Sequence, residues 1–394
     1  MKWGYPLVEI GELVSSVNKW NPRQSKNNEL IKYIDIASVN REAKKVENIV
    51  EVFAHEAPSR ARQLIMDGDI IVSTVRPNLN AVAHLKTGLS GATASTGFTV
   101  LRSNSKKVCD RYLYYWVRSP YFIQDMVRLS SGASYPAVSD SIIKAYKIPL
   151  PALEEQKSIA AILDKADAIR RSRQKAIALT EELLRSTFLD MFGDPVTNPK
   201  GWKVKPLSEL CTKITDGTHK TPTYVADGIS FLSAKNVKAH KIDWVNTKFI
   251  EEKEHNSLIN RCHPESGDIL LTKSGSIGAA AIVDRNTSFS LFESLALIKI
   301  ADKKIVSSIF LASLLNSQSI KGFYARNTKG VAIKHLHLVD IRKLPIIVPP
   351  KSQQEVFVKM TDSIKSLESR VNKHYLCSDN LFNSLLQKAF RGEL

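Results

Sequence analysis

The chain has 394 residues, of which 43% are hydrophobic, and a formal net charge of +17 at pH 7. This length suits two or three domains rather than one core, and the apolar content excludes a largely disordered chain. No apolar run approaches the roughly 20 residues of a membrane span, and the N-terminal MKWGYPLVEI lacks a signal-peptide core. The four cysteines are scattered without a C-x-x-C pair, which favours reduced thiols over disulfides or zinc. We therefore expect a cytoplasmic protein.

Residues 1–150 have the pattern of a β-rich globular domain. Short apolar runs at 31–39, 68–75 and 97–102 are separated by Asn, Gly, Ser and Pro, as is typical of strands and turns. One stretch, 110–132, is instead rich in aromatic residues and has helical character. The first part of the chain is thus predicted to be a mainly β domain that carries one helical patch.

Residues 151–195 are predicted to form one long helix that acts as a spacer. Pro149 and Pro151 mark its start, Gly193 and Pro195 mark its end, and no Gly or Pro interrupts it. A helix over 154–192 would be about 58 Å long at about 1.5 Å per residue. A helix of this length needs a partner for its apolar seam. The predicted seam contains Ile159, Ile162, Leu163, Ala166, Ile169, Ala176, Thr180, Leu183, Leu184, Thr187 and Met191, with Arg173 as its main polar member.

The second part of the chain repeats the plan of the first. The sequence Gly-Asp-Ile-Ile at 68–71 corresponds to Gly-Asp-Ile-Leu at 267–270, at an offset of 199. A second β-rich domain is therefore expected at 196–348, and a second long helix at 349–394. The predicted seam of this helix contains Phe357, Met360, Ile364, Leu367, Val371, His374, Ser378, Leu381 and Leu385. The fold class is α+β, with two β-rich domains separated by two long helices in an internal repeat.

The positive charge belongs to the globular parts. Residues 1–153 carry a net +7 and residues 193–350 a net +8, whereas the central helix, 154–192, is neutral and 351–394 carry +2. A uniformly solvated surface would not divide its charge in this way. The globular domains are therefore expected to meet a polyanion.

Four segments carry a family resemblance. They are PLPALEEQ (149–156), MFGDPVTNPKGW (191–202), GDILLTKSGSIG (267–278) and LLQKAFRGEL (385–394). Together, and in this order, they resemble the specificity subunit of type I restriction–modification enzymes. The second helix opens with Lys-Ser-Gln-Gln at 351–354 where the first has Leu-Glu-Glu-Gln at 153–156, a small departure from the repeat.

The resemblance implies a specific organisation. Each globular domain would be a target-recognition domain that reads one half of a bipartite, asymmetric site in double-stranded DNA. The helices would form an antiparallel coiled coil that sets the gap and docks two modification (methyltransferase) subunits. Restriction subunits, which are ATP-dependent translocases and nucleases, would join through the complex. The chain itself is then expected to be non-catalytic and to need no cofactor.

The sequence has no convincing set of catalytic residues. Asn198-Pro-Lys200 lacks the second proline and the aromatic residue of an amino-methyltransferase loop, and the sequence has no phosphate-binding loop for ATP. Glu42-Ala-Lys44 and Glu251-Glu-Lys253 have the letters of a nuclease motif, but such triples are common in a chain with 24% charged residues. His335-x-His337 leaves a metal open as a minor alternative to DNA contact or plain surface.

Candidate DNA-binding residues follow matching strands in the two domains. In the first domain they are Thr74, Arg76, Asn78, Asn80 and Tyr135. Arg and Asn are suited to base edges because they pair with guanine and adenine in bidentate fashion. The alternative is a polar loop without a ligand. In the second domain the candidates are Thr218, His219, Lys220, Lys235, Asn236, Lys273, Ser274, Ser276, Lys329, Lys334, His335 and His337.

Two other functions remain as alternatives. One is a stand-alone enzyme that modifies or cleaves DNA, against which the missing methylase and ATPase motifs count. The other is a coiled-coil adaptor that does not bind DNA, and the two separately basic domains count against it.

Overall fold

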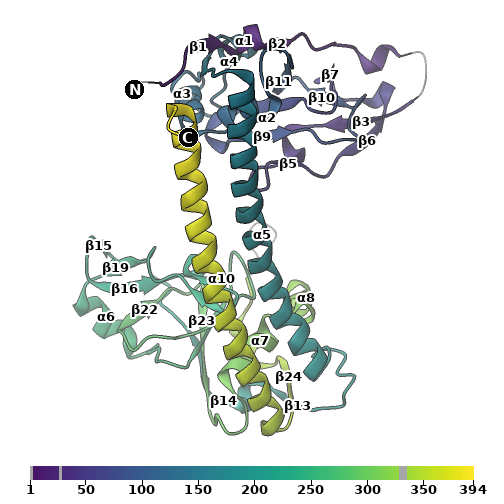
Figure 1. The fold of residues 1–394 in the computed structure, drawn as a ribbon. Coiled ribbons are helices and arrows are strands. Elements are labelled where there is room, and N and C mark those ends of the chain that lie inside the picture. The colour runs from purple at the N-terminus through teal and green to yellow at the C-terminus, as the bar shows by residue number, and fades with distance from the viewer. Residues whose placement is uncertain (1–2, 26–28, 328–334) are drawn as a thin grey trace. The chain divides into compact units, whose positions relative to one another are not determined.

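The computed structural model describes residues 3–25, 29–327 and 335–394. The chain divides into two compact units: unit 1 is Met1–Lys175 with Asn372–Leu394, and unit 2 is Ala176–Val371. Two long helices, α5 (Leu153–Phe192) and α10 (Lys351–Arg391), each contribute one end to each unit (Figure 1). Both helices lie where the sequence predicts them, and Gly193 ends α5 with a φ of +75°.

Unit 1 is built from two larger sheets and two short strand pairs. The first sheet has the order β6 (Val50–Phe53), β3 (Leu30–Ile34), β10 (Thr93–Ser95), β7 (Ala61–Leu64). The second has the order β2 (Val14–Ser15), β11 (Phe98–Ser103), β8 (Ile70–Ser73), β9 (Val82–His84). The pairs join β1 (Leu7–Glu9) to β12 (Lys147–Pro149) and β4 (Val39–Asn40) to β5 (Lys45–Val46). Its short helices are α1 (Ile10–Leu13), α2 (Asp110–Val117), α3 (Pro120–Arg128) and α4 (Asp140–Ala145).

Unit 2 repeats this topology except for one outer strand: β7 of unit 1 pairs with β10, whereas the outer strand β15 of unit 2 (Tyr224–Val225) pairs at the opposite edge of the sheet, with β19 (Lys248–Ile250). Its sheets have the orders β15 (Tyr224–Val225), β19 (Lys248–Ile250), β16 (Ile229–Leu232), β22 (Phe289–Leu291) and β14 (Cys211–Asp216), β23 (Leu295–Ile300), β20 (Ile269–Thr272), β21 (Ala280–Ile282). The pairs join β13 (Lys203–Pro206) to β24 (Pro345–Val348) and β17 (Val237–Lys238) to β18 (Lys241–Ile242). Its short helices are α6 (Glu252–Ile259), α7 (Ser308–Leu315), α8 (Gln318–Asn327) and α9 (Leu338–Arg342). The parallel pairing of β16 with β22 matches that of β3 with β10, so the predicted internal repeat is confirmed.

The repeated Gly-Asp sequence makes the same tight turn before the central strand in each unit. The glycine has a φ of +85° in one turn and +89° in the other, a conformation that favours glycine. The Asp69 carboxylate accepts a hydrogen bond from the backbone three residues earlier and pairs with Arg102 at 2.8 Å. Asp268 repeats both contacts, with Lys299 as its cation at 2.7 Å. The motif recurs because it closes a turn and ties it to the neighbouring strand.

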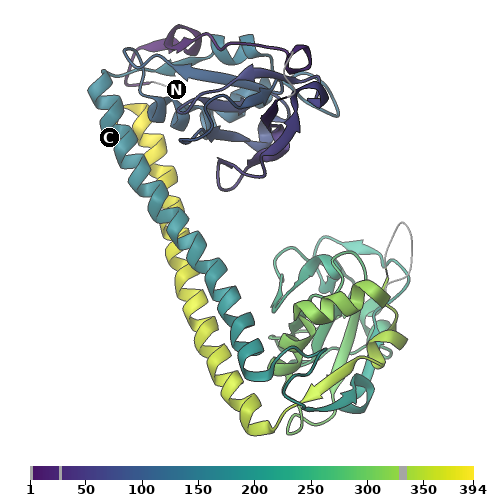
Figure 2. The same cartoon turned by 90° about the vertical axis from the view of Figure 1, so that its right-hand side faces the viewer.

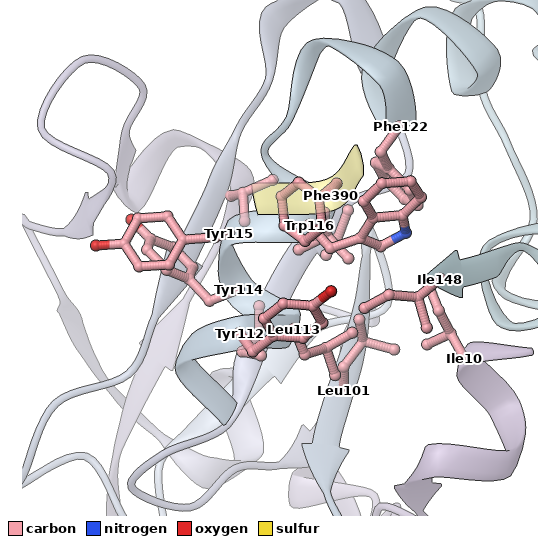
Figure 3. Close-up of a cluster of buried hydrophobic side chains, with 14 of the residues drawn as sticks. Ile10, Leu101, Tyr112, Leu113, Tyr114, Tyr115, Trp116, Phe122, Ile148 and Phe390 are labelled. Carbon is pink, nitrogen blue, oxygen red and sulfur yellow. The ribbon is translucent and has the colours of Figure 1, made fainter. Parts of the chain in front are cut away.

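Aromatic side chains join the long helices to the core of each unit. In unit 1, Trp116 and Tyr112 of α2 pack against Phe390 of α10 with ring centroids 4.8 and 5.2 Å apart (Figure 3). In unit 2, Phe188 of α5 contacts both Phe310 of α7 and Phe357 of α10, at 5.7 and 5.6 Å. The helix ends therefore bury aromatic surface in the globular cores as well as against each other.

The two long helices pair antiparallel within each unit, as both views show (Figures 1 and 2). In unit 1 the Arg170 guanidinium lies 3.2 Å from the Asp379 carboxylate, and Arg173, three residues later, donates to the carbonyl of His374, five residues earlier. Contacts that advance along one helix while they retreat along the other define an antiparallel pair. Arg173, the main polar member of the predicted seam, thus forms a hydrogen bond between the two helices.

The seam prediction was right for some positions and wrong for others. Ile159, Leu163, Ala166, Thr180 and Leu184 are buried on α5, as are Phe357, Ile364 and Ser378 on α10. Several predicted seam residues are exposed instead: Ile162, Ile169, Leu183, Met360, Leu367, His374 and Leu381. The difference has a physical cause, because the helix ends also pack on α2 and α7. The buried face there includes aromatic residues outside the three–four pattern.

A buried glutamine fastens the first turn of each long helix to its globular core. Gln156 is 1% exposed; its Oε1 accepts from the Cys109 N–H at 2.8 Å and its Nε2 donates to the Pro151 carbonyl at 2.9 Å. Gln354 is fully buried and accepts from the Ser307 N–H at 2.9 Å. Cys109 and Ser307 are the N-cap residues of α2 and α7. The matching glutamines at an offset of 198 therefore serve the same structural purpose.

Replacement of Gln354 by Leu is expected to destabilise the protein. The substitution keeps the side-chain volume but leaves the Ser307 N–H and two carbonyl groups, of Ile305 and Pro349, without their partner. Each buried group that loses its hydrogen bond costs about 1–3 kcal/mol. Chemical denaturation should show a loss in this range or above. The adjacent, exposed Gln353 is the matched control, and its change to Leu should alter stability by no more than about 0.5 kcal/mol. Equal effects of the two substitutions would contradict the role of Gln354 in attaching α10 to the core of unit 2.

Candidate nucleic-acid interface

The loop that follows β8 in unit 1 is held at both edges by backbone hydrogen bonds. The Thr74 N–H donates to the Gly97 carbonyl, and the Val138 N–H donates to the Thr74 carbonyl, each at 2.9 Å. Val75 pairs with Ala137 in an isolated antiparallel bridge. The loop therefore lies against the segment that precedes α4, which brings Tyr135 to the same place as residues 74–80.

Arg76 and Tyr135 form an exposed pair in this place. The Arg76 guanidinium carbon lies 4.5 Å from the centre of the Tyr135 ring, and the tyrosine is 68% exposed. A cation over an aromatic face is attracted by the ring quadrupole, which fixes the direction of the guanidinium. Asn78 is exposed in the next turn, whereas the Asn80 amide points inward and donates to the Arg118 carbonyl at 3.0 Å. The structure thus gathers three accessible polar side chains and gives Asn80 a supporting contact.

The backbone of this loop is strained at two positions. Arg76 has a φ of +50° and Asn80 a φ of +46°, both left-handed. The equivalent positions in unit 2 are occupied by Gly275 and Gly278, with φ of +70° and +88°. An L-residue such as Arg costs roughly 1–2 kcal/mol in this region, and glycine avoids that cost. Unit 1 therefore keeps an arginine where the fold alone would accept glycine, which is common at functional sites.

The matching loop in unit 2 is held by equivalent backbone hydrogen bonds. The Lys273 N–H donates to the Ser294 carbonyl at 2.8 Å, and the Leu336 N–H donates to the Lys273 carbonyl at 2.9 Å. Ser274 pairs with His335 in an antiparallel bridge, as Val75 does with Ala137. The predicted correspondence between the two loops is thus seen in the backbone, and Lys273 occupies the place of Thr74.

Asp216, at the end of β14, is the centre of a charged cluster in unit 2. Its side chain is 3% exposed and receives the Lys273 ammonium, the Arg261 guanidinium at 2.7 Å and the His219 ring at 3.4 Å. His219 also lies 3.2 Å from Glu293. Burial alone would raise the pKa of Asp216, but the hydrogen bond and charge of Lys273, with Arg261 and His219, hold it below its usual value. The carboxylate is therefore ionised at neutral pH.

The other predicted residues of unit 2 lie in different environments. Asn236 is buried, caps a short 3-10 helix and donates to the Asn246 carbonyl at 2.9 Å, so its side chain serves the fold. Thr218 is half-buried, and its hydroxyl accepts from the Lys220 N–H at 3.1 Å. Lys329 and Lys334 lie outside the described residues. The remaining candidates are exposed or half-buried: Lys220, Lys235, Ser274, Ser276, His335 and His337.

Sequence reasoning missed two features of this surface. Arg261 follows α6, far in sequence from the predicted loops, and reaches the same carboxylate as Lys273. Lys248 of β19 lies over the ring of Tyr224 in β15, with its Nζ 3.7 Å from the ring centre. Strand alternation could have suggested the Lys–Tyr pair only once β15 was known to pair with β19, which is not the next strand along the chain. No local signal pointed to Arg261.

Lys44 supports the loop of unit 1 from a half-buried position. It lies in the turn between β4 and β5, and its ammonium donates to the Asn80 carbonyl. Burial, together with the positive charges of Arg118 and Arg170, lowers the pKa of Lys44 to about 7, and Asp167 acts in the opposite direction. A cation is thus placed under the loop at a cost that depends on pH.

In the described part of the chain, no three His, Cys, Asp or Glu side chains gather in a way that could hold an ion. In the same part of the chain, no helix is long and apolar enough to cross a membrane.

Comparisons with known proteins agree with one another. The family described as the type I restriction modification DNA specificity domain matches twice, at residues 4–181 and 199–374. The type I restriction enzyme EcoBI specificity subunit of Escherichia coli is 25% identical over 316 residues, which cover 72% of this chain and 65% of that protein. The MjaIX specificity subunit of Methanocaldococcus jannaschii is 26% identical over 369 residues, which cover 88% and 82%.

A solved structure supports the fold. A chain from work on complex assembly and conformational transition of the type I R-M system has a TM-score of 0.59 and 23% identity. The alignment covers 100% of this chain and 98% of that one. The likeness is of fold, and it extends over both units.

Replacement of Arg76 by Gly is expected to leave stability almost unchanged. Relief of the left-handed strain offsets the greater flexibility of the unfolded chain and the lost contact with Tyr135, so the net change should stay within about 0.5 kcal/mol. Val75→Gly in the same loop is the control; it should cost about 1 kcal/mol or more, because Val75 has no such strain to release. Chemical denaturation distinguishes the two. A comparable loss in both variants would show that Arg76 is held without strain.

Replacement of Lys44 by Met is expected to change how stability depends on pH. Between about pH 7 and the usual value near 10.5, the folded wild type has lost the Lys44 proton while the unfolded chain keeps it. Stability therefore rises with pH in this window. The free energy of unfolding of the wild type should increase relative to Lys44→Met between pH 7 and 10. Lys44→Arg, which stays charged throughout, should also lack the increase. Parallel pH profiles for wild type and Lys44→Met would contradict the lowered pKa of Lys44.

Proposed function

The chain belongs to the type I restriction modification DNA specificity family, and from this membership we propose that it is the DNA-recognition subunit of a type I restriction–modification complex. The observation that carries the proposal is the twofold family match, with one copy beginning in each globular part of the chain. Each globular domain reads one half of a bipartite site in double-stranded DNA. The domains are residues 1–150 and 196–348, and the spacer helices are 151–195 and 349–394.

The two half-sites differ in sequence, so the whole target is asymmetric. This follows from the loops, which share a backbone but not a chemistry. Unit 1 presents Arg76, Asn78 and Tyr135, whereas unit 2 has Gly275 at the position of Arg76 and a cluster around Asp216. Side chains of different hydrogen-bonding capacity select different base edges in the major groove.

The long helices dock the modification subunits and set the unread gap. Large apolar side chains on both helices remain exposed, and such surface is typical of sites that bind another protein. In unit 1 they are Ile162, Ile169, Leu376 and Leu381; in unit 2 they are Leu179, Leu183, Leu189, Val356, Met360 and Leu367. The internal repeat favours two modification subunits, one on each set. Helices of 40 and 41 residues without interruption suit a fixed spacing.

Catalysis belongs to the other subunits of the complex. Modification subunits supply methyl transfer, and restriction subunits supply ATP-dependent translocation and cleavage. The chain described here contributes binding and positioning without a cofactor, and it acts in the cytoplasm. DNA binding is driven by phosphate contacts with the basic domains and is therefore strongly dependent on salt.

Methylome sequencing tests the proposal. A host that carries this chain and its modification partner should methylate a bipartite site, and neither protein alone should do so. Exchange of residues 202–348 for the matching domain of a relative should change one half-site only. Arg76→Ala should relax one base position in the other half and cost about 1–3 kcal/mol of affinity if the arginine pairs with guanine. Methylation by the isolated chain, or a swap that alters both halves, would refute the proposal.

A further inference from the structure

We propose that Arg261 reads a base in the second half-site and that Asp216 is its positioning residue. This inference rests on the proposed function and names the group that performs recognition in unit 2. The predicted candidates in this domain were loop residues, and one of them, Lys273, proves to be buried. Arg261 shares its carboxylate partner, but 58% of the arginine side chain is exposed.

The backbone that carries Arg261 is fixed on both sides. Its own N–H and that of Cys262 both donate to the Leu258 carbonyl in the last turn of α6, at 3.2 and 3.1 Å. Its carbonyl accepts from the Lys213 ammonium at 2.7 Å, and the Cys262 side chain is buried in the core. The arginine therefore begins from a rigid position, as a base-reading side chain requires.

Asp216 fixes the other end of the side chain. One carboxylate oxygen accepts from Arg261 Nη2 at 2.7 Å, and the second is held by Lys273. Because the hydrogen bond joins two charged groups, it is short and strong, and it holds Nη2 of the guanidinium in one place. The rest of the fork stays exposed, and two parallel N–H donors of an arginine match the O6 and N7 acceptors of guanine.

The local charge balance favours base reading over phosphate contact. Asp216 and Glu293 lie against Lys273, Arg261 and His219, so the cluster is close to neutral. A phosphate contact gains from net positive charge, and two carboxylates would weaken it. A guanine contact gains from direction, and Asp216 supplies it through its hydrogen bond to Arg261. Lys273, which is buried, keeps Asp216 ionised so that it can hold Arg261.

Substitutions at Arg261 test the base contact. The complex with the modification subunit is used throughout, and binding is measured on duplexes that carry each of the four bases at every position of the second half-site. Arg261→Lys keeps the charge but loses the fork. It should reduce discrimination at one guanine position by roughly 5- to 150-fold and leave the first half-site unchanged. Arg285→Lys, an exposed arginine of the same unit that stacks on Trp244, should change neither half.

Substitutions at Asp216 test the positioning role. Asp216→Glu keeps the charge and displaces the carboxylate by one methylene, and it should relax the same base position. Asp216→Asn combined with Lys273→Thr removes the buried ion pair without leaving a buried unpaired charge, since Arg261 is exposed. Thr is the residue at the matching position of unit 1. It should produce the same relaxation although Arg261 is intact. If this double variant fails to fold, Asp216→Glu decides.

Three results would overturn the inference in whole or in part. An Arg261→Lys complex with unchanged discrimination would remove Arg261 from base reading, and an equal loss of affinity on all sequences would assign it to phosphate. Relaxation in Arg261→Lys without any in the Asp216 variants would remove the positioning role. Failure of the proposed function itself looks different, because the wild-type complex would then recognise neither half-site.

Discussion

The structure depends on how a long helix is attached to a globular domain at its first turn. Gln156 and Gln354 make this attachment with a fully satisfied amide, which accepts from the N-cap backbone of a core helix and donates to the carbonyl before its own helix. An apolar contact alone would hold the helix without fixing its rotation. Three directed hydrogen bonds in a buried site fix both the position and the rotation of the helix, because each broken bond would leave an unsatisfied group. Both units keep this attachment of helix to core, whereas the loops around it differ between the units.

The divergence explains which features the sequence could reveal. Repeat boundaries, the two helices and the Gly-Asp turns were predictable, because Pro, Gly and apolar spacing encode them locally. The place of the loops after β8 and β20 was predictable for the same reason. The role of Asn236 and the burial of Lys273 were not, since each depends on a partner from a distant strand or turn. Arg261 was missed because only tertiary structure brings it to Asp216.

The two units support an exposed arginine by different physical means. Arg76 is directed by an aromatic ring and carried on a strained backbone, and Arg261 is directed by a buried carboxylate on a relaxed one. The Tyr135 ring restrains the Arg76 guanidinium against a face, whereas the hydrogen bond to Asp216 restrains one nitrogen of Arg261. The two units thus direct an exposed arginine through different atoms.

In the proposed function, the net charge of the chain and its local charge pairs have separate roles. A net charge of +17 attracts any duplex, since phosphates look alike in every sequence. Arg261, the residue that we propose to read a base in unit 2, has its charge compensated by Asp216. Compensation reduces the attraction of Arg261 for the phosphate backbone and leaves the directed hydrogen bond as its main contribution. A recognition domain can thus be strongly basic overall and nearly neutral at the point where it reads.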